Sequence, residues 1–248
     1  MEQKLRIGAV NYLNTKPLIY GLQGEPISNQ IELILDYPSN LTFHLQKNKI
    51  DIALLPVATM SLIQDARIIS NYCIAAKQKV NSVCLFSEVP IEDIQEIYLD
   101  YQSRTSVMLL RVLLKSFWNL RPALLQADED YITHISGKRA GLIIGDRALM
   151  HLQTFPYVYD LAEAWYQFTK LPFVFAAWVA NKEIDSQFLE LFESANAKGL
   201  QQINTIVESI DFPYFDLKEY YENSIQYTLD EEKRNGLTMF LKMVEQLN

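Results

Sequence analysis

Apolar and polar positions follow two alternating periods along the first part of the chain. Short apolar runs lie at residues 6–10, 30–35 and 50–55, and helical patterns lie between them. The first of these helices opens near Pro17, and the second covers residues 39–48. This βαβαβ spacing predicts a parallel sheet.

The pattern changes at Arg67 and a second unit then begins. Two adjacent extended runs are predicted at 67–76 and 82–87. Further strands are predicted at 96–100, 141–146 and 173–179. Helices are predicted at 105–118, after the strand at 141–146 as far as His151, and at 162–166. Everything after Ser186 is predicted to be helical, including an amphipathic segment at 230–247.

This organisation predicts an α/β protein of two lobes with a central cleft. The first lobe is expected to comprise residues 1–82 plus 178–248, and the second residues 83–177. The two crossover strands that join them are expected at about 73–86 and 173–179. Ligands of such sheets bind outside the carboxyl ends of the strands, so the functional residues are expected in the cleft.

Composition and charge narrow the function classes. Of the 248 residues 49% are hydrophobic, and 22 Lys and Arg face 30 Asp and Glu, a net charge of −8. Without a basic run, a general nucleic-acid binder is excluded. The longest apolar run, 171–180, is half of the roughly 20 residues needed to cross a bilayer, and the N-terminus lacks a secretory pattern. A soluble cytoplasmic protein without a membrane partner is therefore expected.

The two cysteines agree with a reducing compartment. Cys73 and Cys84 lie in apolar, strand-like surroundings, where packed reduced thiols are the usual state. A disulfide or metal pair is the less favoured alternative, because CxxC and Cys/His spacings are missing. No nucleotide loop or HExxH motif occurs either, so neither a metal nor an organic cofactor is expected.

Five motifs follow one another between residues 6 and 180. They are YLNTKP after the first strand, DIALLPVA, DYQSRTSVMLLRVLL, GLIIGDRAL, and YDLAEAWYQFTKLPFVFAAWVA. Together they closely resemble the chorismate dehydratases of menaquinone biosynthesis by the futalosine route. The resemblance implies a periplasmic-binding-protein-like fold of type II. It also implies a cofactor-independent hydro-lyase that converts chorismate, a small dianion, to 3-[(1-carboxyvinyl)oxy]benzoate.

A sibling family on the same fold makes dihydroxynaphthoate. There, the strand that matches GLIIGD ends in a turn containing a histidine that supplies a base. Here the turn is Gly145–Asp146, which favours the dehydratase. The rival from another class is a non-catalytic receptor or sensor domain for a small anion, because transport receptors and regulators share the fold.

The substrate needs two anion sites, and an acidic protein can provide them through helix N-termini and hydroxyl groups. The first candidate site follows a predicted strand and opens a helix: Ser103, Arg104, Thr105 and Ser106. Plain capping of that helix is the alternative. The second candidate is Ser39 with Asn40, where capping is the favoured explanation of the serine. Pro56, Val57 and Ala58 are expected to offer backbone N–H groups at the same mouth.

Catalytic roles are predicted for Asn14, Ser82 and Asp146. For Ser82, which begins a crossover strand, a polar residue at a strand edge is the alternative. The Asn14 amide can both donate and accept, and the alternative is an Asx-turn. Its neighbours Tyr12 and Thr15 are predicted to bind substrate, with packing an equal alternative for Tyr12. Asp146 is a candidate base or the orienter of a donor, with capping of its helix as the alternative, and Gly145 before it is predicted to bind substrate. None of the three histidines falls in a motif, so we favour a substrate-assisted mechanism in which the enolpyruvyl carboxylate of the substrate removes the proton.

Overall fold

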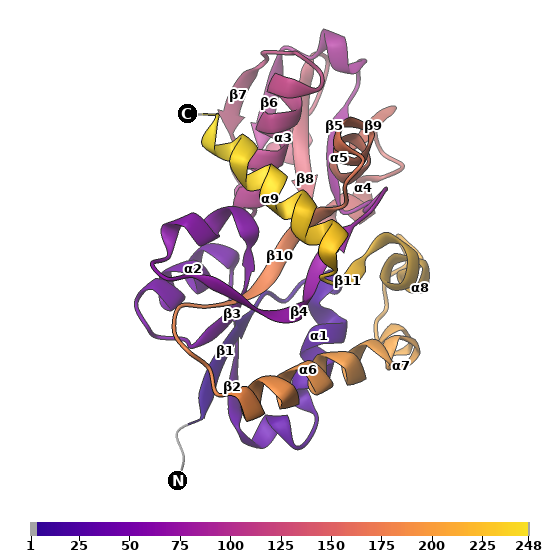
Figure 1. The fold of residues 1–248 in the computed structure, drawn as a ribbon. Helices are drawn as coiled ribbons and strands as arrows, with labels where there is room; N and C mark the ends of the chain where they lie inside the picture. Colours follow the sequence, from indigo (N-terminus) through magenta and orange to yellow (C-terminus); the bar gives the residue numbers. More distant parts are fainter. Residues whose placement is uncertain (1–3, 248) are drawn as a thin grey trace. The chain divides into compact units, whose positions relative to one another are not determined.

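The computed structural model describes residues 4–247 and divides into two compact units, each built on its own sheet (Figure 1). Unit 1 comprises Met1–Ala75 and Val174–Asp230, and unit 2 comprises Ala76–Phe173 and Glu231–Asn248. The chain therefore changes unit three times. The first two changes fall inside the runs predicted as crossover strands.

Unit 1 carries a mixed sheet in the order β11-β4-β10-β3-β1-β2. Its parallel core is β1 (Leu5–Ala9), β2 (Ile31–Leu35) and β3 (Ile52–Pro56), in the register Leu5 with Ile31 and Ile7 with Ile52. The remaining strands are β10 (Phe173–Ala180), antiparallel to β3, β4 (Arg67–Ala76), and β11 (Gln226–Thr228), antiparallel to β4. All five residues of β3 are buried, as a central strand requires.

The helices of unit 1 pack closely at two glycines. They are α1 (Lys16–Gln23), α2 (Pro38–Gln46), α6 (Ser186–Leu200), α7 (Ile203–Glu208) and the single turn α8 (Leu217–Glu219). A Cβ on Gly21 would lie 1.9 Å from the carbonyl oxygen of Ala195, and one on Gly199 would lie 1.9 Å from that of Pro17. Only glycine allows α1 and α6 to approach this closely.

Unit 2 carries the second mixed sheet, in the order β7-β6-β8-β5-β9. Its strands are β5 (Val83–Ser87), β6 (Glu96–Leu99), β7 (Ala123–Gln126), β8 (Arg139–Ile144) and β9 (Tyr157–Asp160). β6 pairs in parallel with β7 and β8, and β5 runs antiparallel to β8 and β9. Its helices are α3 (Arg104–Ser116), α4 (Asp146–His151), α5 (Leu161–Thr169) and α9 (Glu231–Glu245).

The C-terminal helix α9 belongs to unit 2, whereas the prediction placed all of 178–248 in the first lobe. The ring of Phe240 packs edge-on against Phe173 at 4.8 Å and against Trp165 at 6.0 Å. A Cβ on Gly236 would lie 2.2 Å from the carbonyl oxygen of Pro172, so the helix approaches that backbone closely. Aromatic packing, which a sequence pattern does not show, decides which unit this helix joins.

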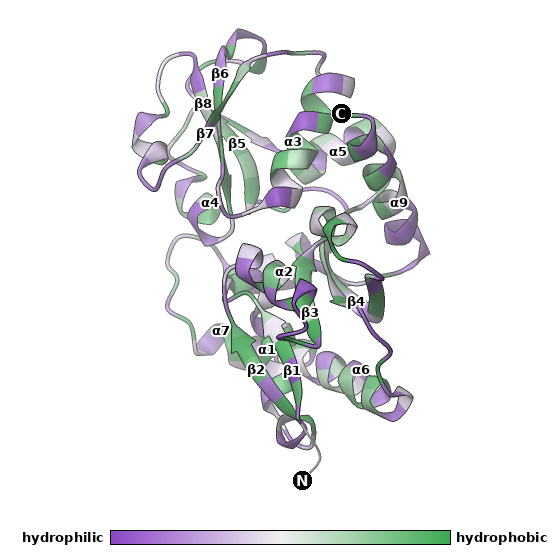
Figure 2. Ribbon diagram, turned by 90° about the vertical axis from the view of Figure 1, so that its left-hand side faces the viewer, coloured by the Kyte–Doolittle hydropathy of each residue, from purple (hydrophilic) through white to green (hydrophobic). Residues whose placement is uncertain are grey.

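Most predicted elements are present, and the differences are short strands. In Figure 2 the apolar residues concentrate along the strands of both sheets, which explains why apolar runs in the sequence predicted most of these strands. The strands β7 and β9 were not predicted, and the prediction of helix throughout after Ser186 is wrong at β11. These strands have only three or four residues, which leaves little room for a period to appear, although β6, which also has four residues, was predicted.

Candidate functional site

In unit 1, the predicted site residues gather at one edge of the sheet. Because β1, β2 and β3 are parallel neighbours, the loops that follow them start from the same edge. The ends of these strands and the segments that follow them contain all the unit 1 residues predicted to contact substrate: Tyr12, Asn14, Thr15, Ser39, Asn40, Pro56, Val57 and Ala58. The topology thus brings together segments that lie up to about 45 residues apart.

Thr15 shapes the turn after β1 from within. Its hydroxyl oxygen lies 2.6 Å from the carbonyl oxygen of Val10 and 2.7 Å from that of Tyr12, and it accepts the backbone N–H of Tyr12 at 3.2 Å. The side chain is fully buried. These bonds support a structural role for Thr15, and its predicted contact with substrate stays a prediction.

Asn14, in the same turn, has an unsatisfied polar atom. Its side-chain oxygen is buried and, among the described residues, has no hydrogen-bond partner. Its backbone carbonyl accepts a hydrogen bond from the Tyr227 hydroxyl at 2.9 Å. A buried amide oxygen without a donor is costly to a fold unless a ligand or water satisfies it. The Asn14 side-chain oxygen is therefore suited to accept a hydrogen bond from a donor group of a ligand.

The loops after β2 and β3 differ from expectation in detail. The N-cap of α2 is Tyr37, and no side-chain capping bond is made, so Ser39 lies within the first turn and is not the cap. The Asn40 amide donates to Asp36 Oδ1 at 2.9 Å, and both Ser39 and Asn40 are exposed. After β3, Pro56 has no N–H, so only Val57 and Ala58 can present backbone donors.

In unit 2, a second group of predicted residues gathers at one edge of its sheet. The segments Ser103–Ser106 and Gly145–Asp146 follow the parallel neighbours β6 and β8. Ser82 directly precedes β5, which is antiparallel to β8, so it lies beside the end of β8. The Gly145 N–H donates to the Ser82 carbonyl at 2.7 Å. Gly145 has φ 64° and ψ −146°, a conformation that glycine alone adopts readily.

The loop before Ser82 is held by Asp160, which the sequence analysis missed. One carboxylate oxygen of Asp160 accepts the N–H groups of Val80 and Asn81 at 2.8 and 2.7 Å, and the other caps α5 through Ala162 and Glu163. Burial raises the pKa of Asp160 to about 6, although the four backbone donors act in the opposite direction. No role was predicted for Asp160, although it lies just before the helix predicted at 162–166.

The start of α3 shows the capping that was the alternative to an anion site. Ser103 is the N-cap, and its hydroxyl oxygen accepts the backbone N–H of Ser106 at 3.2 Å. The hydroxyls of Ser103 and Ser106 lie 2.9 Å apart. Thr105 and Ser106 are buried, whereas Arg104 is exposed. Capping by Ser103 does not occupy the other N–H groups at this helix end.

Two further residues at this edge were missed. Asp100 directly follows β6, and its side chain is completely buried, while Arg147 lies in the first turn of α4. Arg147 Nη2 donates to Asp100 Oδ2 at 2.7 Å. Burial raises the pKa of Asp100, whereas Arg147 and the Gln102 N–H lower it. The motif GLIIGDRAL contained Arg147, but its partner lies 47 residues away.

The candidate bases occupy different places. Asp146 is the first residue of α4 and is half-buried. His44 and His151 lie in the last turns of α2 and α4, and His134 lies in a 3₁₀ turn, Tyr131–His134. None of these three histidines follows a strand at either edge described above. Across residues 4–247, no three His, Cys, Asp or Glu side chains are grouped so as to hold a metal ion.

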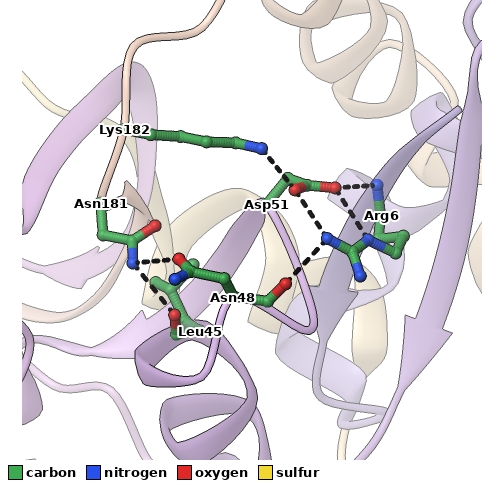
Figure 3. Close-up of polar contacts among 6 residues, drawn as sticks. All are labelled: Arg6, Leu45, Asn48, Asp51, Asn181 and Lys182. Atoms are coloured by element: carbon green, nitrogen blue, oxygen red, sulfur yellow. Dashed lines mark hydrogen bonds and ion pairs between the residues drawn. The ribbon is translucent and has the colours of Figure 1, made fainter. Parts of the chain in front are cut away.

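A charged cluster in unit 1 lies at the opposite ends of the strands (Figure 3). Asp51, just before β3, accepts Arg6 Nη2 at 3.0 Å and Lys182 Nζ at 2.6 Å. Burial by itself would raise the pKa of Asp51, but the hydrogen bonds from Arg6 and Lys182 lower it to about 2. Because Asp51 precedes its strand, this cluster stabilises the sheet away from the predicted ligand edge.

Solved structures share this fold over most of their length. A protein from Archaeoglobus fulgidus has a TM-score of 0.74 at 14% identity, covering 98% of this chain and 97% of its own. An ABC transporter protein from Parabacteroides distasonis has a TM-score of 0.69 at 18% identity, covering 99% and 93%. A Candida albicans protein described as having the generic periplasmic binding protein fold has a TM-score of 0.59 at 12% identity, covering 99% and 94%. The predicted periplasmic-binding-protein-like fold is confirmed.

Two sequence relatives share one described activity. The chorismate dehydratase of Thermus thermophilus is 26% identical over 94% of this chain and 93% of its own length. That of Campylobacter jejuni is 28% identical over 97% and 98%. In the described part of the chain, no helix combines the length and apolar character needed to span a membrane. Residues 5–246 match the family described as menaquinone biosynthesis, and the chain belongs to that family.

Proposed function

We propose that this protein is a chorismate dehydratase that acts in menaquinone biosynthesis by the futalosine route. The observation that carries the proposal is the family match over residues 5–246, joined by two relatives of this one activity that align over nearly their whole lengths. The five sequence motifs support it, because four of them lie at the strand ends where such folds bind ligands.

The reaction is the loss of water from a cyclohexadiene ring. The C–H bond at the carbon bearing the enol ether breaks, the neighbouring C–OH bond breaks, and a C=C bond forms between the two carbons. The product, 3-[(1-carboxyvinyl)oxy]benzoate, is aromatic, which supplies the driving force. No electron is transferred to an acceptor, so the chemistry needs only a proton acceptor and help for the departing hydroxyl.

We assign the proton acceptor to the substrate itself. Its enolpyruvyl carboxylate is tethered beside the C–H bond and reaches it without a loss of translational freedom. The proton then leaves with the hydroxyl group as water. In this scheme the Asn14 side-chain oxygen, which has no partner among the described residues, accepts a hydrogen bond from the substrate hydroxyl, and Ser82 orients the carboxylate. Asp146 is the alternative base.

The carboxylates need positive potential in an acidic protein. The amino end of α3, with Thr105 and Ser106, supports one anion site, since its backbone N–H groups and helix dipole favour a negative charge. Val57 and Ala58 after β3, with Ser39, Asn40 and Tyr12, are assigned to the other end of the substrate. No metal or organic cofactor takes part in the proposed step.

The proposal places the enzyme in the cytoplasm. Cys73 and Cys84 are both buried and free, as in proteins of reducing compartments.

The test is direct. Purified protein, dialysed against a chelator, is incubated with chorismate, and loss of chorismate is followed together with formation of the aromatic product. Turnover at a rate unchanged by the chelator is expected. Tight binding without turnover would instead favour the rival hypothesis, a non-catalytic receptor or sensor domain for a small anion. Activity lost on dialysis and restored by a metal would contradict the cofactor-independent mechanism.

A further inference from the structure

Arg147 is held in one place by a buried acid and two aromatic rings. Its guanidinium carbon lies 5.3 Å from the ring centre of Tyr101 and 5.9 Å from that of Tyr131. Its Nη2 donates to Asp100 at 2.7 Å. An arginine fixed by a pair and by stacking has lost its side-chain entropy on folding, so binding a ligand costs it little more.

Asp100 is itself saturated and acts as the anchor. Its Oδ1 accepts the Gln102 N–H at 2.7 Å, and its Oδ2 lies 2.8 Å from the Tyr131 hydroxyl as well as near Arg147. That hydroxyl lies 2.7 Å from the carbonyl oxygen of Leu142. The carboxylate is therefore committed to groups within unit 2 and has no exposed surface.

In the Arg147–Asp100 ion pair only the positively charged side chain is accessible to solvent. A guanidinium carries five N–H donors. Among the described residues, Arg147 gives one hydrogen bond, to Asp100, and the side chain is 25% exposed while that of Asp100 is 0% exposed. Among the described residues the remaining donors have no hydrogen-bond partner, and the exposed quarter of the side chain lets a ligand approach it. The carboxylate that neutralises the arginine is not accessible to that ligand.

The position of this cation coincides with the predicted ligand edge. Asp100 follows β6, and the first turn of α4 follows β8, its parallel neighbour. The same edge carries the amino end of α3 and the Ser82–Gly145 bond. Asp146, which directly precedes Arg147 and is the first residue of α4, is a second acidic residue at this edge. Arg147 is thus a fixed guanidinium beside the groups assigned to substrate.

We propose that Arg147 binds a carboxylate of the substrate through its free N–H groups, with Asp100 as its positioning residue. The inference rests on the proposed function and names a residue of that same site. A planar guanidinium can meet a carboxylate with two parallel hydrogen bonds, which a lysine cannot do. Under the proposed function the ligand is a cyclic dicarboxylate, and Arg147 binds one of its two carboxylates.

The test separates ligand binding from the loss of a buried ion pair. Arg147→Gln alone leaves Asp100 buried without its cation, so the informative protein is Asp100→Asn/Arg147→Gln, in which neither charge remains. Arg147→Lys keeps the ion pair and loses the planar fork. Arg111→Gln removes an exposed charge from α3 and is the matched control. For each we would measure melting temperature, KM and kcat for chorismate, and calorimetric affinity for 3-[(1-carboxyvinyl)oxy]benzoate and for benzoate.

The double variant is expected to raise KM and the product dissociation constant by about tenfold or more, as the loss of charge-assisted hydrogen bonds predicts. Arg147→Lys is expected to raise both several-fold, and Arg111→Gln to leave both unchanged. A folded double variant or lysine variant with the KM and product affinity of the natural protein would overturn the proposal and leave Arg147 as the counter-ion of Asp100. If the natural protein does not convert chorismate, the proposed function fails, and the product-binding measurements still decide whether Arg147 holds a carboxylate.

Discussion

The hydroxyl of Tyr227 lies 2.9 Å from the backbone carbonyl oxygen of Asn14, and it joins residues 213 positions apart in the chain. Tyr227 comes from β11, in the C-terminal segment that carries no distinctive motif, and its side chain is almost completely buried. The last strand of unit 1 thereby fixes the turn that contains the proposed catalytic amide.

Tyr227→Phe is expected to lower kcat by about fivefold, the effect of one lost hydrogen bond on the position of Asn14. KM should change little, because Tyr227 does not contact substrate in this scheme. Steady-state kinetics with chorismate test this, and the exposed Tyr214→Phe in the same unit is the control. A lower melting temperature with an unchanged kcat would show that Tyr227 serves stability alone.

Asn14→Ala and Asp146→Asn distinguish the two proposed proton acceptors. If the substrate carboxylate takes the proton, Asp146→Asn should keep most of the turnover. Asn14→Ala should then lose about a hundredfold or more in kcat, as the removal of a preorganised polar group predicts. The opposite pattern would identify Asp146 as the base. Rapid dehydration of a chorismate analogue without the enolpyruvyl carboxylate would also contradict substrate assistance.

The two roles of the α3 amino end can be separated by variants of different residues. Ser103→Ala removes the N-cap and should lower the free energy of unfolding by about 0.5–2 kcal/mol. Thr105→Val with Ser106→Ala keeps that cap and should raise KM for chorismate. Chemical denaturation and kinetics measure the two effects. An unchanged KM and kcat in the folded double variant would reject the anion site.

Asp51 makes the stability of unit 1 depend on pH in the acid range. Its pKa in the folded state is about 2, below the ordinary value of 3.8, so its contribution is present above about pH 4 and is lost as the pH falls towards 2. Asp51→Asn is expected to lower the free energy of unfolding at neutral pH by about 1–2 kcal/mol, a value reduced for the solvent exposure of Lys182.

Urea unfolding at pH 7 and near pH 2 measures the difference between Asp51→Asn and the natural protein, and the difference should shrink at the lower pH. Asp36→Asn is the comparison variant. Hydrogen bonds from Asn40 and Tyr37 lower the pKa of Asp36 too, but Asp36 lies outside the cluster of Figure 3. A difference at Asp51 that is equal at both pH values would show that its charge is not the cause.

How far the sequence leads depends on the range of each interaction. The strands β1, β3 and β4 were predicted within two residues of their ends, because a strand of five or more residues buries enough side chains to leave a readable pattern. The short strand β11 has no such pattern and exists because β4 offers it a partner. Likewise, α9 has an ordinary amphipathic pattern, and only its contacts with Phe173 and Trp165 assign it to unit 2.

The sequence by itself determined the parallel βαβαβ core of unit 1, the resemblance to a family, and the segments that carry Asn14 and Ser103–Ser106, since these depend on local periodicity and contiguous motifs. Only the tertiary structure decided which residues support them. Tyr227 reaches Asn14, Asp160 holds the loop before Ser82, and Arg147 meets Asp100 across separations of 47 to 213 residues. A hydrogen bond depends on distance and angle in space. Neither is recorded in the local order of residues, so these partners appear only once the sheets have brought their loops together.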